Sequence, residues 1–364
     1  MSEQLLYQIG LTLIPGVGDV LGKKLVAYCG GPEAVFSEKK RALEKIPGIG
    51  AALIHEITHQ NVLGRAEQEM DFITKKGIQP LFFLDKKYPK RLQHCADSPL
   101  MLYYYGNADL NMQKVIGIVG TRKATDYGKH WCEQFIEELS TNEVLIVSGL
   151  AYGIDSCAHR ASLKYHLPTI GVLAHGLDRI YPPSNRGMAE RMVTQGGLLT
   201  EFMAGTTPDR ENFPRRNRIV AGMVDAIVVI ESAKKGGALI TANIASSYNR
   251  DVFALPGRVG DFTSEGCNYL IRTNKADMIE NAENLRYMLG WDTHKQASPQ
   301  TRLFRDFSED EQKILDAFGD DKESGIDDIM LKSTFPASKL AGLLLGLEFD
   351  GVLVALPGKR YKIA

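Results

Sequence analysis

Short apolar runs recur between residues 113 and 290, and most of them are separated by segments with helical spacing of apolar residues. The runs are Val115–Val119, Val144–Val147, Thr169–Leu173, Leu198–Phe202, Ala226–Ile230 and Val252–Leu255. Nearly continuous apolar strands are typical of sheets covered on both faces. Their alternation with helices predicts an α/β fold with a central Rossmann-like, doubly wound and mostly parallel sheet. Ligands of such sheets bind beyond the carboxyl ends of the strands.

The first 65 residues have a helical pattern that contains one repeated turn. Ile14–Gly18 and Ile46–Gly50 both follow the pattern Ile-Pro-Gly-x-Gly, and each precedes apolar residues at helical spacing. This predicts a helical helix-hairpin-helix (SAM-like) domain over 1–65, whose glycine turns free amides that can receive a phosphate. A helical packing domain whose hairpins only form tight turns explains the pattern as well, because the charge of this segment is nearly balanced.

The segment that begins at residue 66 is assigned to the same extended Rossmann-like domain, 66–290. Gln79–Phe83 and Leu102–Gly106 are predicted strands, and Tyr88–Leu92 is a turn that enters a short helix. The tyrosines at 103–105 can stack on bases, but aromatic runs in strands usually belong to the core of a sheet, and we favour that interpretation.

A polar stretch without a clear period, 291–307, is a predicted linker to a small last unit, 308–364. Ser308 and Glu311 form a capping box that opens a helix. Further helices are predicted at Gly325–Lys332 and Ser338–Leu347, followed by two strands around Pro357-Gly358. Three helices and a hairpin indicate a winged-helix-like domain.

The charge of this last unit argues against contact with DNA. Residues 308–364 contain seven Lys and Arg against eleven Asp and Glu, a net charge of -4, and the presumed recognition helix has one cation, Lys339. An acidic surface repels phosphate. We expect the unit to contact protein, or to leave DNA alone.

Composition narrows the class of protein. A length of 364 residues suggests two or three domains, and a formal net charge of -1 requires any nucleic-acid site to be a local basic patch. The five cysteines are scattered and form no CxxC, which predicts reduced thiols in a cytoplasmic protein, without a zinc site. We find no signal peptide and no apolar run of the roughly 20 residues that a membrane helix needs.

Five loops that follow predicted strands carry the candidate chemistry. The first contains Gly120, Thr121, Arg122 and Lys123, and it precedes a predicted helix over 126–140. Amides, a hydroxyl and a guanidinium at a helix start form a phosphate-binding site. The loop lacks both the dinucleotide fingerprint GxGxxG and the P-loop pattern. An arginine that caps the helix or pairs with an acid is the structural alternative.

The second loop, 148–159, is rich in glycine and begins with Ser148 and Gly149, which allow close approach of a ligand to the backbone. Asp155 and His159 lie one helical turn apart, so an acid–base pair is conceivable. We favour a structural role for both residues, because the pair has no accompanying nucleophile.

The other three loops add cations and aromatic groups. The long loop 174–186 ends with Arg186 and contains Arg179 and Tyr181. The loop 211–218 holds the most basic cluster of the chain, and 231–241 places two lysines before two glycines. Their candidate site residues are Phe213, Arg215, Arg216, Asn217, Arg218, Lys234, Lys235, Gly236 and Gly237. Five neighbouring loops of this kind fit an extended anionic chain better than one nucleotide, and arginines next to an aromatic residue suit phosphates and stacked bases.

These loops resemble those of the DNA-processing protein A family, also called Smf. The matching segments are IVGTRKAT at 118–125, VSGLAYGIDSCAH at 147–159, LAHGLDRIYPPSN at 173–185, FPRRNRIVAG at 213–222, KKGGALIT at 234–241 and DVFALPG at 251–257. The resemblance spans nearly the whole chain, because the family shares the three-part layout. It implies a protein without catalytic residues, cofactor or metal. Such a protein binds incoming single-stranded DNA in natural transformation, protects it, helps to load the RecA recombinase and works as a homodimer through the Rossmann-like domain.

The resemblance also implies which residues bind DNA. They are Arg122, Arg186, Arg215 or Arg216 together with Arg218, and Lys234 or Lys235, with Phe213 as the residue on which a base stacks. Many members have a serine where this chain has Gly237, which leaves a hydroxyl contact in doubt.

A nucleotide-processing enzyme is the alternative function. Phosphoribohydrolases of the lysine-decarboxylase-like family share this fold and a phosphate loop with two glycines. Such an enzyme needs a catalytic carboxylate after the loop, and Leu239–Asn243 offers none. We therefore rank this alternative below DNA binding.

Overall fold

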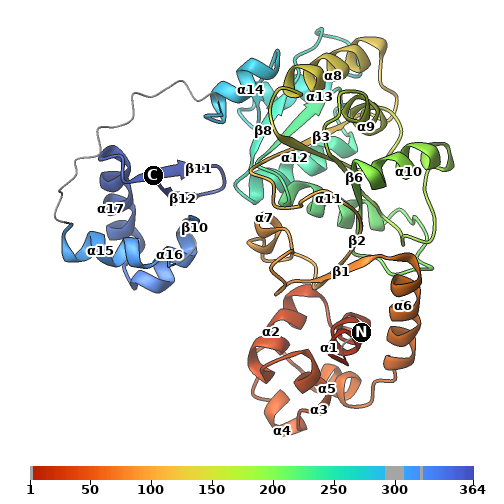
Figure 1. Ribbon diagram of the computed structural model, residues 1–364, viewed down its shortest axis with the longest axis vertical. Helices are drawn as coiled ribbons and strands as arrows, with labels where there is room; N and C mark the ends of the chain where they lie inside the picture. The colour runs from red at the N-terminus through yellow and green to blue at the C-terminus, as the bar shows by residue number, and fades with distance from the viewer. Residues whose placement is uncertain (1–2, 292–306, 320–322) are drawn as a thin grey trace.

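The protein folds into three parts in chain order (Figure 1), described here from a computed structural model for residues 3–291, 307–319 and 323–364. Residues 292–306, most of the predicted linker, lie outside the described residues. The predicted class is confirmed, because a mixed α/β domain with a mostly parallel central sheet follows an N-terminal helical unit.

The central sheet has nine strands in the order β1-β2-β6-β5-β4-β3-β7-β8-β9. Neighbouring strands from β6 through β9 are parallel, whereas β1 and β2 are antiparallel additions at one edge. The strands are β1 (Gln79–Phe82), β2 (Met101–Gly106), β3 (Lys114–Gly120), β4 (Val144–Ser148), β5 (Thr169–Val172), β6 (Gly196–Thr200), β7 (Ala226–Ile230), β8 (Asp251–Ala254) and β9 (Asp277–Met278). Every predicted strand is present.

The chain changes direction across this sheet at β3. It first builds β4, β5 and β6 on one side of β3 and then crosses to β7 on the other side. The point between β3 and β7 is therefore the topological switch point, where sheets of this type bind their ligands.

Helices cover both faces of the sheet. They are α7 (Lys90–Gln93), α8 (Asp126–Leu139), α9 (Ile154–Lys164), η1 (Pro183–Asn185), α10 (Arg186–Thr194), α11 (Asn212–Gly222), α12 (Gly237–Ser247), α13 (Glu265–Arg272) and α14 (Ala282–Met288). Side chains alternate along β3, as in any strand. Val115 packs with Leu239 of α12 in one apolar layer, and Ile116 packs with Phe135 of α8 in the other.

The N-terminal unit shares its core with the edge of the sheet. Its helices are α1 (Glu3–Leu13), α2 (Asp19–Cys29), α3 (Pro32–Ser37), α4 (Lys40–Leu43), α5 (Ala51–Thr58) and α6 (Leu63–Lys76). The predicted domain boundary at 65/66 falls inside α6, and Ile73 of this helix belongs to the same cluster as Phe82 and Tyr103. Tyr103 and Tyr104 are thus core, as favoured above, whereas Tyr105 at the end of β2 is 38% exposed, so the core interpretation does not hold for it.

Both repeated turns are tight hairpins that need glycine. Gly16 has φ +79° and Gly48 has φ +87°, a region that residues with a Cβ atom avoid. Lys24 joins the hairpins, because its Nζ donates to Pro47 O at 2.8 Å. The helix after the first hairpin packs on the central domain, where Asp19 Oδ1 accepts a hydrogen bond from Leu100 N at 2.9 Å. The first hairpin unit therefore packs against the central domain, which is the structural role considered as the alternative from the sequence.

The C-terminal unit contains α15 (Glu309–Asp316), α16 (Ile326–Ser333), α17 (Ala337–Phe349) and a sheet of β10 (Glu323–Gly325), β12 (Arg360–Ile363) and β11 (Leu353–Leu356), in that order. The predicted capping box is present, since Ser308 Oγ accepts from Glu311 N and Glu311 Oε2 accepts from Ser308 N. The strand β10 was not predicted. The unit has the helices and the hairpin expected of a winged helix.

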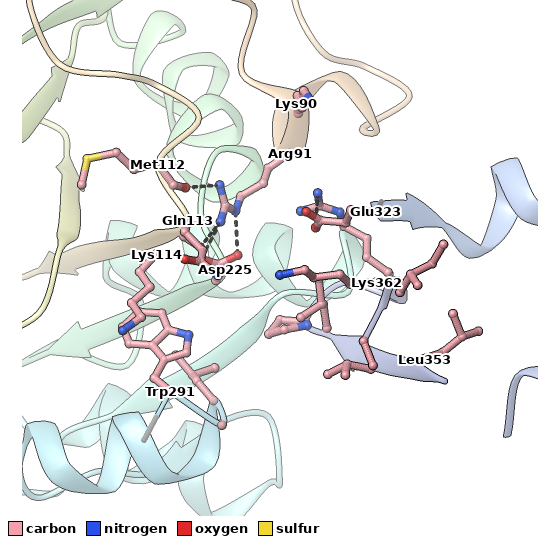
Figure 2. A pocket seen from close by; sticks show the side chains of 18 of the residues that line it. Lys90, Arg91, Met112, Gln113, Lys114, Asp225, Trp291, Glu323, Leu353 and Lys362 are labelled. Carbon is pink, nitrogen blue, oxygen red and sulfur yellow. Dashed lines mark hydrogen bonds and ion pairs between the residues drawn. The ribbon is translucent and has the colours of Figure 1, made fainter. Parts of the chain in front are cut away.

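A cleft of about 860 Å³ separates this unit from the central domain, next to a buried ion pair (Figure 2). Arg91 Nε donates to Asp225 Oδ1 at 2.6 Å, and both side chains are about 8% exposed. Lys114 and Lys362 line the cleft together with Glu323. Because cations and carboxylates are mixed here, the cleft has no evident preference for an anionic chain.

Candidate nucleic-acid interface

The loop after β3 starts at the switch point and is held by β7. Gly120 can only be glycine, because a Cβ atom there would collide with Ile230 O and with the Ile154 side chain. Thr121 N donates to Glu231 O at 2.7 Å. The buried Glu231 carboxylate also accepts from Thr125 N at 2.9 Å and from the Thr125 hydroxyl. Glu231 was not among the predicted site residues, although an acid that directly follows an apolar strand is a usable signal.

This anchoring presents two cations at the edge of the sheet. The hydroxyl of Thr125 caps α8 by accepting from Gly128 N at 3.2 Å. Arg122 and Lys123 lie between the anchored Thr121 and this cap, and both side chains are exposed. The strand, the short loop and the helix start lie as predicted, but the backbone amides of Thr121, Lys123 and Thr125 donate to groups within the protein. The side chains of Arg122 and Lys123, rather than these amides, are therefore available to a phosphate.

The second predicted loop packs against the loop after β3 and supports it. Ile154 N donates to Thr121 O at 3.1 Å, and Gly153, with φ +77°, allows the close approach of the two loops. Ser148 is fully buried, and its Oγ donates to Ile118 O at 2.6 Å. The hydroxyl of Ser148 is thus used inside the protein, and the structure gives it a supporting position rather than an exposed one.

A small cavity of about 80 Å³ opens beside Arg122 at the carboxyl ends of β4 and β5. Its walls include Tyr152, His175, Tyr181 and Phe213. The Arg122 guanidinium lies 5.0 Å from the centre of the Phe213 ring, and the rings of Phe213 and Tyr181 are 6.4 Å apart. A cation beside two aromatic rings can contact a phosphate and stack a base at the same time. Sequence reasoning named Phe213 but omitted Tyr152, an aromatic residue in a glycine loop.

Arg216 forms the floor of this cavity and is 4% exposed. Its Nη1 donates to Val172 O at 2.5 Å and to Gly149 O. Burial lowers the pKa of Arg216 to about 10, against the opposing effect of Asp155. The side chain is therefore still charged at neutral pH and places positive potential under the cavity without reaching its mouth. Gly149, also predicted, takes part as the acceptor of this bond.

The other two arginines of the cluster face Glu201. Arg215 is exposed, lies 3.2 Å from Glu201 Oε2 and stacks 4.9 Å from the centre of Phe202. Arg218 donates to the same carboxylate oxygen at 2.5 Å and lies 3.1 Å from Asp19 Oδ2. Arg218 thus ties the N-terminal unit to the central domain, whereas Arg215 remains accessible. Asn217, between them on α11, is half-buried.

Replacing Arg218 by alanine is expected to destabilise the fold without changing how DNA binding depends on salt. The change leaves Glu201 buried with one partner fewer, which costs on the order of 3 kcal/mol. Urea unfolding measures the loss, and a binding titration at several salt concentrations checks the DNA side. A reduced salt slope in a folded Arg218→Ala protein would assign this arginine to phosphate contact instead.

Three predicted cations stand free at the same edge of the sheet. Arg186 at the start of α10 and both Lys234 and Lys235 before α12 are exposed, and none forms an ion pair within the described ranges. Gly236 is confined by Ser232, whereas a Cβ atom on Gly237 would meet nothing within 4 Å. A serine, as in many family members, therefore fits at position 237. The free cations extend from the loop after β5 to the loop after β7.

Asp155 and His159 serve the fold, as favoured from the sequence. Asp155 Oδ2 accepts from Ala151 N at 3.3 Å, and the fully buried His159 shares a 2.7 Å hydrogen bond with Thr169 Oγ1. Burial, with help from Arg216, lowers the pKa of His159 to about 3. The two side chains therefore interact with other partners rather than as an acid–base pair.

His159 is expected to make the fold sensitive to acid. Its folded pKa of about 3 lies below the unfolded value of about 6.5, so the unfolded state binds the extra proton. The contribution of His159 is complete above pH 6.5 and is lost as the pH falls, by up to about 1.4 kcal/mol per pH unit. Urea unfolding of the wild type and His159→Gln between about pH 7 and 4 tests this. Equal slopes in both proteins would contradict it.

Comparison with known proteins places the chain in a family. Residues 79–290 match the family described as DNA recombination-mediator protein A, and 294–359 match the DprA winged helix domain. The Smf protein of Synechocystis sp. is 39% identical over 293 residues, 79% of this chain and 73% of the relative. The Smf protein of Escherichia coli is 34% identical and covers 74% of each chain.

Two solved structures share the fold. The DNA processing protein A of Streptococcus pneumoniae has a TM-score of 0.67 at 30% identity, covering 79% of this chain and 98% of that one. The protein of the same name from Helicobacter pylori, described for its unique single-stranded DNA binding mode, has a TM-score of 0.54 at 30% identity, covering 60% and 97%.

The three parts define an architectural class, a Rossmann-like domain between a helical unit and a winged helix. The chain belongs to the DNA recombination-mediator protein A family, and the resemblance inferred from its loop motifs is confirmed. The comparisons do not favour the phosphoribohydrolase-like alternative. In the described residues, no helix is both long and apolar enough to span a membrane, and no cluster of metal-ligating side chains occurs.

Proposed function

We propose that this protein binds single-stranded DNA along the carboxyl edge of its central sheet, protects the strand and helps to load RecA in recombination. It acts as a homodimer in the cytoplasm and has no catalytic residues. The site consists of Arg122 and Lys123, the Phe213 cavity, Arg186, Arg215 and the Lys234-Lys235 loop, and Gly120, Gly149 and Arg216 shape it.

One observation carries the proposal, namely the exposed Arg122 guanidinium 5.0 Å from the Phe213 ring at the mouth of the cavity. It offers one phosphate contact and one stacking surface at the switch point of the sheet. The cations that flank it on both sides suit a ligand longer than one nucleotide. Single-stranded DNA binding described for the Helicobacter pylori relative supports the same ligand class.

Fluorescence anisotropy with labelled oligothymidine and with a duplex of equal length tests the proposal. We expect preference for the single strand and a linear decrease of log K with log salt, with a slope of about −0.7 for each phosphate contact. Binding of the duplex with equal affinity, or binding that is independent of salt, would refute the proposed ligand.

The role in RecA loading and the homodimer rest on the resemblance of the loop motifs to the family. They are tested with the same protein. Sedimentation should give twice the mass of the chain, and RecA should assemble faster on a strand covered by single-strand-binding protein when this protein is added. A monomer would rule out the homodimer, and unchanged RecA assembly would rule out the loading role. Neither result would contradict the proposed DNA-binding site.

A further inference from the structure

A second basic surface adjoins the cavity. A groove of about 580 Å³ runs from the loop after β3 between the first turns of α8 and α9 toward Ser184 and Asn185. Arg122, Lys123, Lys129 and Arg160 line it, and among the described residues along its walls none has a carboxylate. Lys129 and Arg160 were not predicted as site residues.

The walls of the groove are held in place by internal hydrogen bonds. Asn185 Nδ2 donates to Leu150 O and to Ser156 Oγ, both at 2.9 Å. The thiol of Cys157 on α9 donates to Lys129 O on α8 at 3.4 Å, which joins the two helices. The helices that carry Lys129 and Arg160 are therefore fixed to each other, so a ligand that binds needs to order only the cation side chains.

The nearby carboxylates do not neutralise the positive charge of the groove. Asp126 lies 2.9 Å from Lys129, but its side chain is fully exposed, so this pair is weak and readily exchanged for a phosphate. Glu133 faces Lys164 at 2.6 Å. Asp155 is buried and accepts from the Ala151 amide. Arg160 is exposed and has no ion-pair partner in the part of the chain that the structure describes.

The groove continues the cavity, because Arg122 and Tyr152 line both. Tyr152 is 50% exposed and lies where the two join, so its ring is available to a base on either side. A phosphodiester chain suits this combination of an aromatic junction and a row of cations. An acidic protein segment would use the cations alone and leave the adjoining cavity empty.

We propose that the DNA strand leaves the Phe213 cavity past Tyr152 and runs along this groove, with phosphates against Lys123, Lys129 and Arg160. This inference rests on the proposed function and adds a direction to it. The strand passes over α8 and α9 on the β4 side of β3, in addition to the contacts at the Lys234-Lys235 loop.

Binding of oligothymidines of increasing length to Arg160→Glu tests the inference. We expect unchanged binding of an oligonucleotide just long enough for the cavity, and about tenfold weaker binding of a long one, as for the loss of one charge-assisted contact. The salt slope for the long strand should fall by about 0.7. Lys76→Glu, an exposed charge reversal on α6, is the matched control and should match the wild type.

Three outcomes would overturn the inference. One is wild-type affinity of Arg160→Glu for the long strand, and another is equal weakening for all lengths. The third is that the wild type binds an acidic peptide and Arg160→Glu does not, while Arg160→Glu still binds DNA. Arg122→Ala, measured in parallel, distinguishes a failure of the groove from a failure of the proposed function. If it weakens DNA binding while Arg160→Glu does not, the groove is wrong and the proposed function stands, whereas if neither weakens it, both fail. A melting temperature of Arg160→Gln equal to that of the wild type would show that the position tolerates substitution.

Discussion

Replacing Arg122 by alanine is expected to weaken the binding of oligothymidine by about 10- to 100-fold, the effect of losing a charge-assisted contact of about 1.5–3 kcal/mol. The guanidinium is exposed, lies over Phe213 and borders both the cavity and the basic groove. Its removal should also reduce the salt slope by about 0.7, because one phosphate contact is lost. Fluorescence anisotropy over a range of salt concentrations measures both quantities.

Arg191→Ala is the matched control, since Arg191 is exposed in the last turn of α10, at the end away from the binding edge. It should bind like the wild type. Arg122→Lys should be intermediate, because lysine keeps the charge but lacks the planar fork of the guanidinium. If Arg122→Ala and Arg191→Ala have the same affinity, Arg122 is not the centre of the site.

Replacing Asp225 by alanine is expected to destabilise the central domain by about 3–5 kcal/mol, the typical cost of leaving one partner of a buried ion pair alone. Arg91 would keep only its bonds to the backbone, which run from Nη1 to Met112 O at 2.9 Å and from Nη2 to Gln113 O at 2.7 Å. Asp225 Oδ2 also accepts from Val115 N at 2.9 Å and so fixes the start of β3. The midpoint of urea unfolding should fall accordingly.

The double variant Arg91→Met with Asp225→Leu separates the charge from the packing. Because it removes both charges together, it should recover much of the stability lost in the single variant. If Asp225→Ala unfolds at the same urea concentration as the wild type, the buried pair contributes nothing and the interpretation is wrong.

The strands from β3 to β8 were predictable because their apolar runs are buried on both faces, whereas the edge strand β9, with two exposed residues, was not predicted. The runs at 115–119 and 226–230 correspond to β3 and β7, which lie side by side although more than a hundred residues separate them. The three residues of β10 were missed, since Glu323–Gly325 has neither an apolar run nor alternation. Only pairing with β12 makes this segment a strand.

Residue type alone did not separate the roles of the arginines on α11. Arg215 is exposed, Arg216 is the buried floor of the cavity, and Arg218 joins two domains. A helical wheel carries part of the missing signal, because Arg216 shares its face with the buried Ile219 and Val220. The partner of Arg218 could not be found this way, since Glu201 directly follows β6 and lies outside α11.

The basic groove was outside the reach of the sequence for a different reason. Lys129 and Arg160 are single cations on separate helices, and each lies just beyond a quoted motif, 118–125 and 147–159, rather than inside it. They become neighbours of Arg122 only because α8 and α9 pack together behind β3 and β4. Tertiary packing, rather than local pattern, creates this part of the surface.

Photochemical crosslinking of the full chain to oligothymidine, followed by identification of the modified peptides, tests the central claim most directly. We predict crosslinks to the peptides that contain Tyr152, Tyr181 and Phe213, because these aromatic rings surround the cavity at the carboxyl edge of the sheet. Crosslinks confined to the hairpins of the N-terminal unit or to residues 308–364, with none at the carboxyl edge, would contradict the account.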